Sequence, residues 1–273
     1  MRPSRLGFPF GGPLAAICLA SMLLGCGYSE YNRMVSKRVA NLRGEQKFRT
    51  LFAPTQLGDT PVQIRLPMVF QESYVEGSKH KEDGAKIAED RLQPPFLKLP
   101  GFKICYEGRA YDQTPVKTYP YYCYLAAVPS KPGDAENLAK ELQSQLKETF
   151  KDTPDQWEGV DVDSPSGNAV QWKKLRVEGE QSFRFKQPSA KQATPSNLPG
   201  IFEIWLCDKG DYNVIVAWRV PTALQGPSEV PIPTSLQSML TGVKGNMKLD
   251  LGTLPVLTAG TITVDAPDLA DKG

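Results

Sequence analysis

The chain has 273 residues, with 32 Lys or Arg, 30 Asp or Glu and a single histidine. This near balance of charge excludes the strongly basic footprint on which nucleic-acid binding depends. One histidine also excludes multi-histidine metal sites and the H-E-x-x-H motif of metalloproteases.

The N-terminal segment has the pattern of a secretory signal. Arg2 and Arg5 precede an apolar stretch that begins at Leu14, and no acidic residue occurs before Glu30. The stretch is shorter than the ~20 residues that an α-helix needs to cross a bilayer core. A positive start, a short apolar region and small residues at its end are typical of a cleaved signal peptide.

The signal ends in Leu23-Leu24-Gly25-Cys26, which resembles the lipobox of bacterial lipoproteins. In that family the cysteine is acylated and the peptide is cut just before it. The resemblance implies that residues 1–25 are removed and that Cys26 is lipidated, anchoring the chain in a membrane. Because Gly27 is not the aspartate that retains Gram-negative lipoproteins at the inner membrane, it further implies the periplasmic face of the outer membrane. The alternative is an ordinary signal peptide with a chance cysteine.

Residues 26–60 are predicted to tether the anchor to the domain. Between Arg33 and Arg49 there are six basic residues and one acid, Glu45. A helix with this composition could lie on an anionic membrane surface. The alternative is a solvated spacer or an arm packed on the domain.

The globular domain is predicted to span residues 61–249 and to begin with a strand. In "TPVQIRLPMVF", Val62, Ile64 and Leu66 alternate with polar residues, as in a strand with one buried face. The densely charged segment Ser78–Arg91 is predicted to be an exposed loop.

Two further strands are predicted before the first helix. In "FKICYEGRAYD", Phe102, Ile104 and Tyr106 fall on one face by alternation. "YPYYCYLAAV" is apolar on both faces, which indicates a central strand.

The second half of the chain is predicted to alternate between helix and strand. Apolar residues recur on one arc over Asp134–Phe150, which predicts a helix that covers a sheet. Strands are expected at Lys174–Glu178 and Ser182–Lys186, and "IFEIWLCDKGDYNVIVAWRVP" predicts a hairpin. A short helix is expected from Thr234, and residues 250–273 are expected to form a loose tail.

This order of elements resembles the PsbP-like family, an α/β/α sandwich first seen in the extrinsic oxygen-evolving proteins of photosystem II. The resemblance covers Pro61 to Leu249 and rests on element order. It implies an α+β fold in which helices cover an antiparallel sheet. Members of that family mostly act as accessory or assembly factors, so no catalytic residues carry over.

Recognised catalytic motifs are absent from the sequence. It contains no Walker A, G-x-G-x-x-G, G-x-S-x-G or C-x-x-C pattern. Ser144 and Lys147 spell S-x-x-K without its partner motifs, and His80 lies in the charged loop. We therefore assign no catalytic residue and expect no cofactor.

Two stretches remain as candidate binding residues. The cluster Tyr119, Tyr121, Tyr122 and Tyr124 could line a ligand or partner groove, but alternation places these residues on both faces of one strand, which favours core packing for most of them. Asp161 and Asp163 in "DVDSPSGN" begin like a calcium loop, but the sequence then departs from that motif, which favours a turn.

Three cysteines remain outside the signal segment and its end: Cys105, Cys123 and Cys207. An odd number permits at most one internal disulfide. We predict that all three behave mainly as small buried hydrophobes, with no obligatory disulfide.

These patterns predict an anchored envelope lipoprotein with a non-enzymatic binding, accessory or scaffold role. Its expected partners are the membrane, through the lipid, and an envelope protein or polymer. The alternative is a carboxylate-dependent hydrolase, using paired acids such as Asp161 with Asp163 or Glu107 with Asp112. An apolar groove would favour binding, and a concave site with two perturbed carboxyl groups would favour hydrolysis.

Overall fold

The computed structural model describes residues 31–36, 51–77, 79, 89–111, 118–131, 133–164, 168–185, 194–224, 227–231 and 246–264. The chain divides into two units, 1–47 and 48–273, and each is described by itself. In the first unit, residues 31–36 form a helix on which Met34 and Val35 are exposed. Cys26 and the rest of the predicted signal lie outside the described residues.

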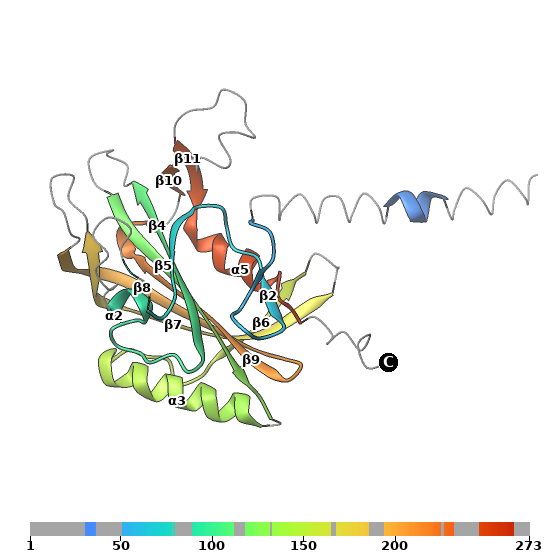
Figure 1. Cartoon of the computed structure of the whole chain (residues 1–273), viewed down its shortest axis with the longest axis horizontal. Helices are drawn as coiled ribbons and strands as arrows, with labels where there is room; N and C mark the ends of the chain where they lie inside the picture. The colour runs from blue at the N-terminus through green and yellow to red at the C-terminus, as the bar shows by residue number, and fades with distance from the viewer. Residues whose placement is uncertain are drawn as a thin grey trace, which may run out of the picture. The chain divides into compact units, whose positions relative to one another are not determined.

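The second unit is built on a nine-stranded antiparallel sheet (Figure 1). Eight of its strands follow the order β11-β10-β4-β5-β9-β8-β7-β6, and β3 also pairs with β4. The strands are β3 (Phe70–Tyr74), β4 (Phe102–Tyr111), β5 (Thr118–Pro129), β6 (Glu158–Asp163), β7 (Ala169–Phe185), β8 (Thr194–Lys209), β9 (Tyr212–Pro221), β10 (Pro227–Pro231) and β11 (Asn246–Asp250).

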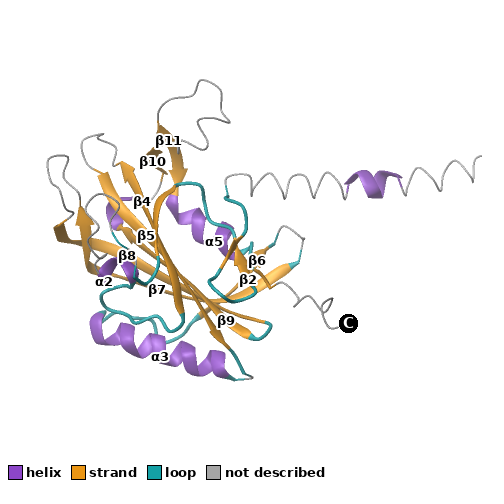
Figure 2. Ribbon diagram, viewed as in Figure 1, coloured by secondary structure: helices purple, strands orange, loops and turns teal. Residues whose placement is uncertain are grey.

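Different structures cover the two faces of this sheet (Figure 2). Helix α3 (Asp134–Thr149) lies on one face, which we call the α3 face. The opposite face carries a three-stranded sheet of β1 (Thr55–Gln56), β2 (Val62–Ile64) and β12 (Thr263–Val264), and we call it the small-sheet face. The remaining short elements are α2 (Glu89–Leu92), η1 (Thr222–Leu224), η2 (Leu251–Thr253) and α5 (Leu254–Ala259).

The predicted α/β/α sandwich is therefore wrong. The described residues form a mostly β structure, with a nine-stranded and a three-stranded sheet. The α3 face is covered by a long helix, whereas the second face is buried chiefly under β1, β2 and β12, together with the short elements η2 and α5. The PsbP-like resemblance rested on element order alone, which does not specify the layer packed on each face.

Strand β5 is central and buried on both faces, as predicted. It pairs with β4 on one side and β9 on the other. Alternation points Tyr122 and Tyr124 to the α3 face, and Tyr121 and Cys123 to the small-sheet face. A strand with two apolar faces needs a covering layer on each side, which is what the domain supplies.

The α3 face is sealed by the predicted amphipathic helix. Leu138, Leu142 and Leu146 of α3 are buried against the sheet, and Phe150 follows them. A Cβ atom on Gly179 of β7 would lie 2.9 Å from the Phe150 ring, so the glycine makes room for that ring. The helical period of the apolar residues was thus sufficient to predict this element.

The predicted face of Phe102 is wrong. The register between β4 and β5 shifts between Phe102 and Ile104. Such an irregularity reverses the alternation of side chains. Phe102 consequently packs on the α3 face, while Ile104 and Tyr106 pack on the small-sheet face.

The predicted hairpin is confirmed as β8 and β9. They pair from Gly200 to Lys209, and their turn contains Gly210 with a φ of 62°. A type II′ hairpin turn requires a positive φ at its first central residue, and glycine is the residue that adopts this conformation most readily. The two strands predicted around residue 180 form one continuous strand, β7.

The expected loose tail is also wrong for residues 251–264. Leu251, Leu254 and Ile262 are buried in the core, and β12 pairs with β2. Alternation and helical periods are hard to recognise in such short elements, so the sequence resembled a tail. Residues 265–273, and the helix predicted from Thr234, lie outside the described residues.

Candidate functional site

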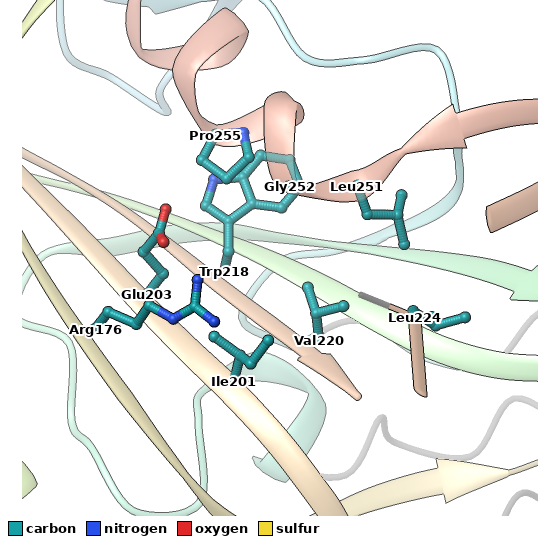
Figure 3. Close-up of a pocket in the computed structure, with 9 residues that line it drawn as sticks. All are labelled: Arg176, Ile201, Glu203, Trp218, Val220, Leu224, Leu251, Gly252 and Pro255. Carbon is teal, nitrogen blue, oxygen red and sulfur yellow. The ribbon is translucent and has the colours of Figure 1, made fainter. Parts of the chain in front are cut away.

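An open pocket of about 320 Å³ lies on the small-sheet face, between strands β7–β9 and the C-terminal segment (Figure 3). Its apolar lining consists of Ile201, Trp218, Val220, Leu224, Leu251 and Pro255. Arg176 and Glu203 supply the charged part of the lining, and Gly252 completes it. This combination of an apolar wall and few polar groups is typical of a small-ligand site.

The sheet register sets one side of the pocket. Arg176 of β7 lies opposite Glu203 of β8, which lies opposite Trp218 of β9. All three point to the small-sheet face. Trp218 is only 2% exposed, and its ring packs 5.6 Å from that of Phe70. The indole therefore forms a rigid apolar surface inside the pocket.

The other side of the pocket comes from the segment that follows β11. Leu251 and Gly252 belong to η2, and Pro255 lies in the first turn of α5. Proline is compatible with that turn because the N–H groups there have no helical partner. Leu251 and Pro255 are buried, so this wall is held in place by the core.

The charged lining is fixed by neighbouring strand residues. Trp205 donates a 2.7 Å hydrogen bond from Nε1 to Glu203, and the Lys174 ammonium lies 3.7 Å from the same carboxylate. Arg176 makes a 2.6 Å ion pair with Glu178. Glu203 is thus held close to a cation, while Arg176 remains partly exposed at the rim.

A second polar cluster surrounds Glu107 of β4, away from this pocket. Glu107 is 2% exposed, and its carboxylate lies 3.4 Å from Arg91 Nε and 3.6 Å from Arg109 Nη2. The Tyr74 hydroxyl lies 3.2 Å from Glu107 and also donates to Glu72. Burial raises the pKa of Glu107, and the positive charges of Arg91 and Arg109 oppose that rise.

The tyrosine cluster does not form a groove. Tyr121, Tyr122 and Tyr124 are at most 1% exposed and divide between the two faces of β5, so core packing is confirmed for them. Tyr119 is partly buried against the small-sheet face. Tyr121 lies directly over Gly108, where a Cβ atom would come within 2.2 Å of its ring.

Asp161 and Asp163 lie on strand β6. Both are exposed, and Val162 between them is buried. Within the described part of the chain, His, Cys, Asp and Glu side chains do not gather in any group of three that could hold a metal ion. The two aspartates therefore form no metal site with other described residues.

The three cysteines are free and buried, which confirms their predicted hydrophobic environment. Cys105 points to the α3 face and Cys123 to the small-sheet face, although their strands are neighbours. Burial raises the pKa of each thiol, to about 12 for Cys207. All three are thus protonated and unreactive near neutral pH.

Of the remaining candidates, Ser144 and Lys147 are exposed on α3, where Lys147 pairs with Asp155. The side chains of His80 and Asp112 lie outside the described residues.

The sequence analysis did not identify the residues that line the pocket. One signal was present, because Glu203 interrupts an otherwise apolar face formed by Ile201, Trp205 and Cys207. A charged residue on the apolar face of an interior strand indicates a buried polar contact or a binding site. Leu251 and Pro255 could not be found in this way, since their segment was expected to be a tail.

No family model, curated protein or solved structure matches this chain with statistical significance. A search of the described residues for a helix that is long and apolar enough to cross a membrane found none.

Proposed function

We propose that this chain is a lipid-anchored binding protein of the bacterial envelope. In this proposal Cys26 carries the anchor, on the strength of the lipobox resemblance, and the domain has no catalytic role. The observation that supports a binding role is the pocket beside Trp218. Placement on the periplasmic face of the outer membrane belongs to the same proposal and rests on Gly27 alone.

The pocket favours a small ligand with an apolar body and one polar end. Its volume of about 320 Å³ is at the lower end of the range for small-molecule sites. Six of its nine lining residues are apolar, so most of the binding free energy would come from apolar burial. Arg176 and Glu203 lie together at one side in Figure 3, where they can orient a polar group of the ligand.

Binding is better supported than hydrolysis by the arrangement of carboxyl groups. Glu203 is the single carboxylate among the lining residues, so the pocket lacks an acid and base pair. Glu107 has a raised pKa but is buried and engaged by two arginines. An envelope protein that inserts an apolar side chain is the other occupant that this lining could accept.

The test is a titration with N-phenyl-1-naphthylamine, a neutral apolar dye that fluoresces when water is excluded from it. We expect saturable binding to the wild-type protein. Val220→Trp should weaken it by about tenfold or more, because the larger side chain occupies the pocket. Val75→Trp is the matched control, since Val75 is 47% exposed and does not line the pocket.

Two outcomes would contradict the proposal. One is the absence of saturable dye binding, and the other is equal binding by both tryptophan variants. Thermal unfolding of each variant should be measured in parallel, so that a loss of binding through unfolding is recognised.

A further inference from the structure

The α3 face contains a buried arginine that the proposed pocket does not involve. Arg219 follows Trp218 in β9 and therefore points to the opposite side of the sheet. Its side chain is inside the domain, with the residue 1% exposed. Three aromatic rings surround the guanidinium, with centroids 4.7 Å away for Phe183, 5.3 Å for Tyr122 and 5.9 Å for Phe96.

The hydrogen bonds of Arg219 use only part of the guanidinium. Nη1 donates to the Tyr124 hydroxyl at 3.2 Å. Nε and Nη2 are buried and have no hydrogen-bond partner among the described residues. Tyr122 of β5 lies between Arg219 of β9 and Glu107 of β4 in the sheet register, so Glu107 is not the direct neighbour of Arg219. Glu107 already interacts with Arg91, Arg109 and Tyr74.

A buried cation in this state is expensive. Transferring a charge from water into an apolar interior costs far more than a cation–π contact returns, unless an opposite charge accompanies it. A negatively charged group in contact with Arg219 would remove most of this cost.

The two unpartnered nitrogens define the shape of that group. Nε–H and one N–H of Nη2 lie along the same edge of the guanidinium and are nearly parallel. This edge matches the two oxygens of a carboxylate in a bidentate arrangement. The Tyr122 hydroxyl and the Gln181 amide are also buried without hydrogen-bond partners among the described residues, and the Tyr122 ring lies against the guanidinium.

The surroundings favour an organic carboxylate over an inorganic phosphate. The rings of Phe96, Tyr122 and Phe183 provide apolar contacts but few donors to replace the hydration of a dianion. Phe96 packs edge-on against Phe150 and Phe202, and it is the partly exposed member of the ring set. Phe96 is therefore the ring that a ligand would have to displace to reach the guanidinium.

We propose that Arg219 and its aromatic neighbours form a second binding site, which takes the carboxylate of a small organic acid with an apolar body. This site is on the other side of the sheet from the Trp218 pocket and does not depend on the function proposed for that pocket.

The test compares benzoate with benzamide, a neutral molecule of nearly the same shape. We expect saturating benzoate to raise the Tm of the wild-type protein by about 3 °C or more, and benzamide to leave it unchanged. Arg219→Met should abolish the benzoate effect. Arg219→Lys keeps the charge but lacks the parallel donors, so titration calorimetry should show at least about tenfold weaker benzoate binding.

The outcomes distinguish carboxylate binding at Arg219 from a general effect of anions on stability. An equal Tm shift with phosphate would show such a general effect and would overturn the assignment to carboxylates. The absence of a shift with benzoate, or an undiminished shift in Arg219→Met, would overturn the site itself. If Arg219→Met does not fold, the wild-type comparison of benzoate with benzamide and phosphate, together with Arg219→Lys, still decides the question.

Discussion

Arg91 and Arg219 are both buried inside this domain, but only Arg91 has a carboxylate in contact with its guanidinium among the described residues. Arg91 lies on α2 and contacts Glu107 at 3.4 Å, and its guanidinium also lies 5.4 Å from the Tyr74 ring centroid. Arg219 has aromatic rings and one tyrosine hydroxyl around it. The first arginine is therefore expected to stabilise the domain through its carboxylate partner, whereas the second is expected to need an added anion.

The substitution Arg91→Met tests the first of these roles. It leaves Glu107 buried without its closest cation, which should cost about 3–5 kcal/mol of unfolding free energy near neutral pH. Burial places the folded-state pKa of Glu107 above its unfolded value, so ionised Glu107 destabilises the native state as the pH rises. Removing the Arg91 charge raises the pKa of Glu107 further. The loss of unfolding free energy in Arg91→Met should therefore be largest above that pKa, where Glu107 is ionised, and smaller at acid pH.

Urea unfolding of the wild-type and variant proteins between about pH 5 and pH 8 measures this difference. Lys147→Met is the control, because it breaks an exposed ion pair with Asp155 and should change stability little at any pH. A loss for Arg91→Met that does not depend on pH would show that lost packing, rather than the charge of Glu107, dominates.

At the scale of residues, the burial of apolar side chains could be predicted from the sequence better than the positions of buried charges. It placed Cys105, Cys123 and Cys207 in hydrophobic surroundings and favoured core positions for most of the tyrosines. It did not reveal that Arg91 and Arg219 are buried. Charged side chains are usually exposed, and only the partners brought together by the fold show where they are not.

At the scale of elements, residues 251–264 close part of the core, although the sequence suggested a loose tail. Helix α5 lies against the core through Leu254 and Ala259, and β12 adds a strand beside β2. Thr263 pairs with Gln63, a residue 200 positions earlier in the chain. This segment therefore links the end of the described chain to the start of the domain.

Leu254→Ala should destabilise the domain by about 2–5 kcal/mol, because Leu254 is 1% exposed and its loss leaves a cavity. Val256→Ala in the same helix is the matched control, since Val256 is 45% exposed and should cost much less. Thermal and urea unfolding of both variants provide the measurement. Equal stabilities for the two variants would contradict the packing of α5 and would restore the interpretation of this segment as a loose tail.

Elements were predictable where a local pattern was long enough. The helix α3 and the β8–β9 hairpin follow from side-chain periods within elements of 10 to 16 residues. Strand β2 was predicted from the alternation of Val62, Ile64 and Leu66, whereas β12 has only two residues and its existence depends on pairing with β2 across the chain. The reversed face of Phe102 likewise depends on the pairing of β4 with β5.

At the scale of the whole molecule, the error in fold class follows from these short elements. A long amphipathic helix and a large antiparallel sheet were expected and are present. The layer on the second face is built from residues before β3 and after β11, which the sequence presented as a lone strand and a tail. The pocket shares that origin, because η2 and α5 form one of its walls.

The proposed lipid anchor is a property of the whole molecule, because it decides where the domain and both proposed sites are held. Expressed in a bacterial host with a metabolic palmitate analogue, the wild-type protein should incorporate the label. Cys26→Ser should lose the label and remain as uncleaved precursor, since the lipobox cysteine is both the acylation site and the boundary of cleavage. Cys18→Ser is the control, because it changes a thiol within the same signal but should keep label and cleavage. Persistent labelling of Cys26→Ser would contradict the anchor, and both proposed binding sites would then belong to an unanchored protein.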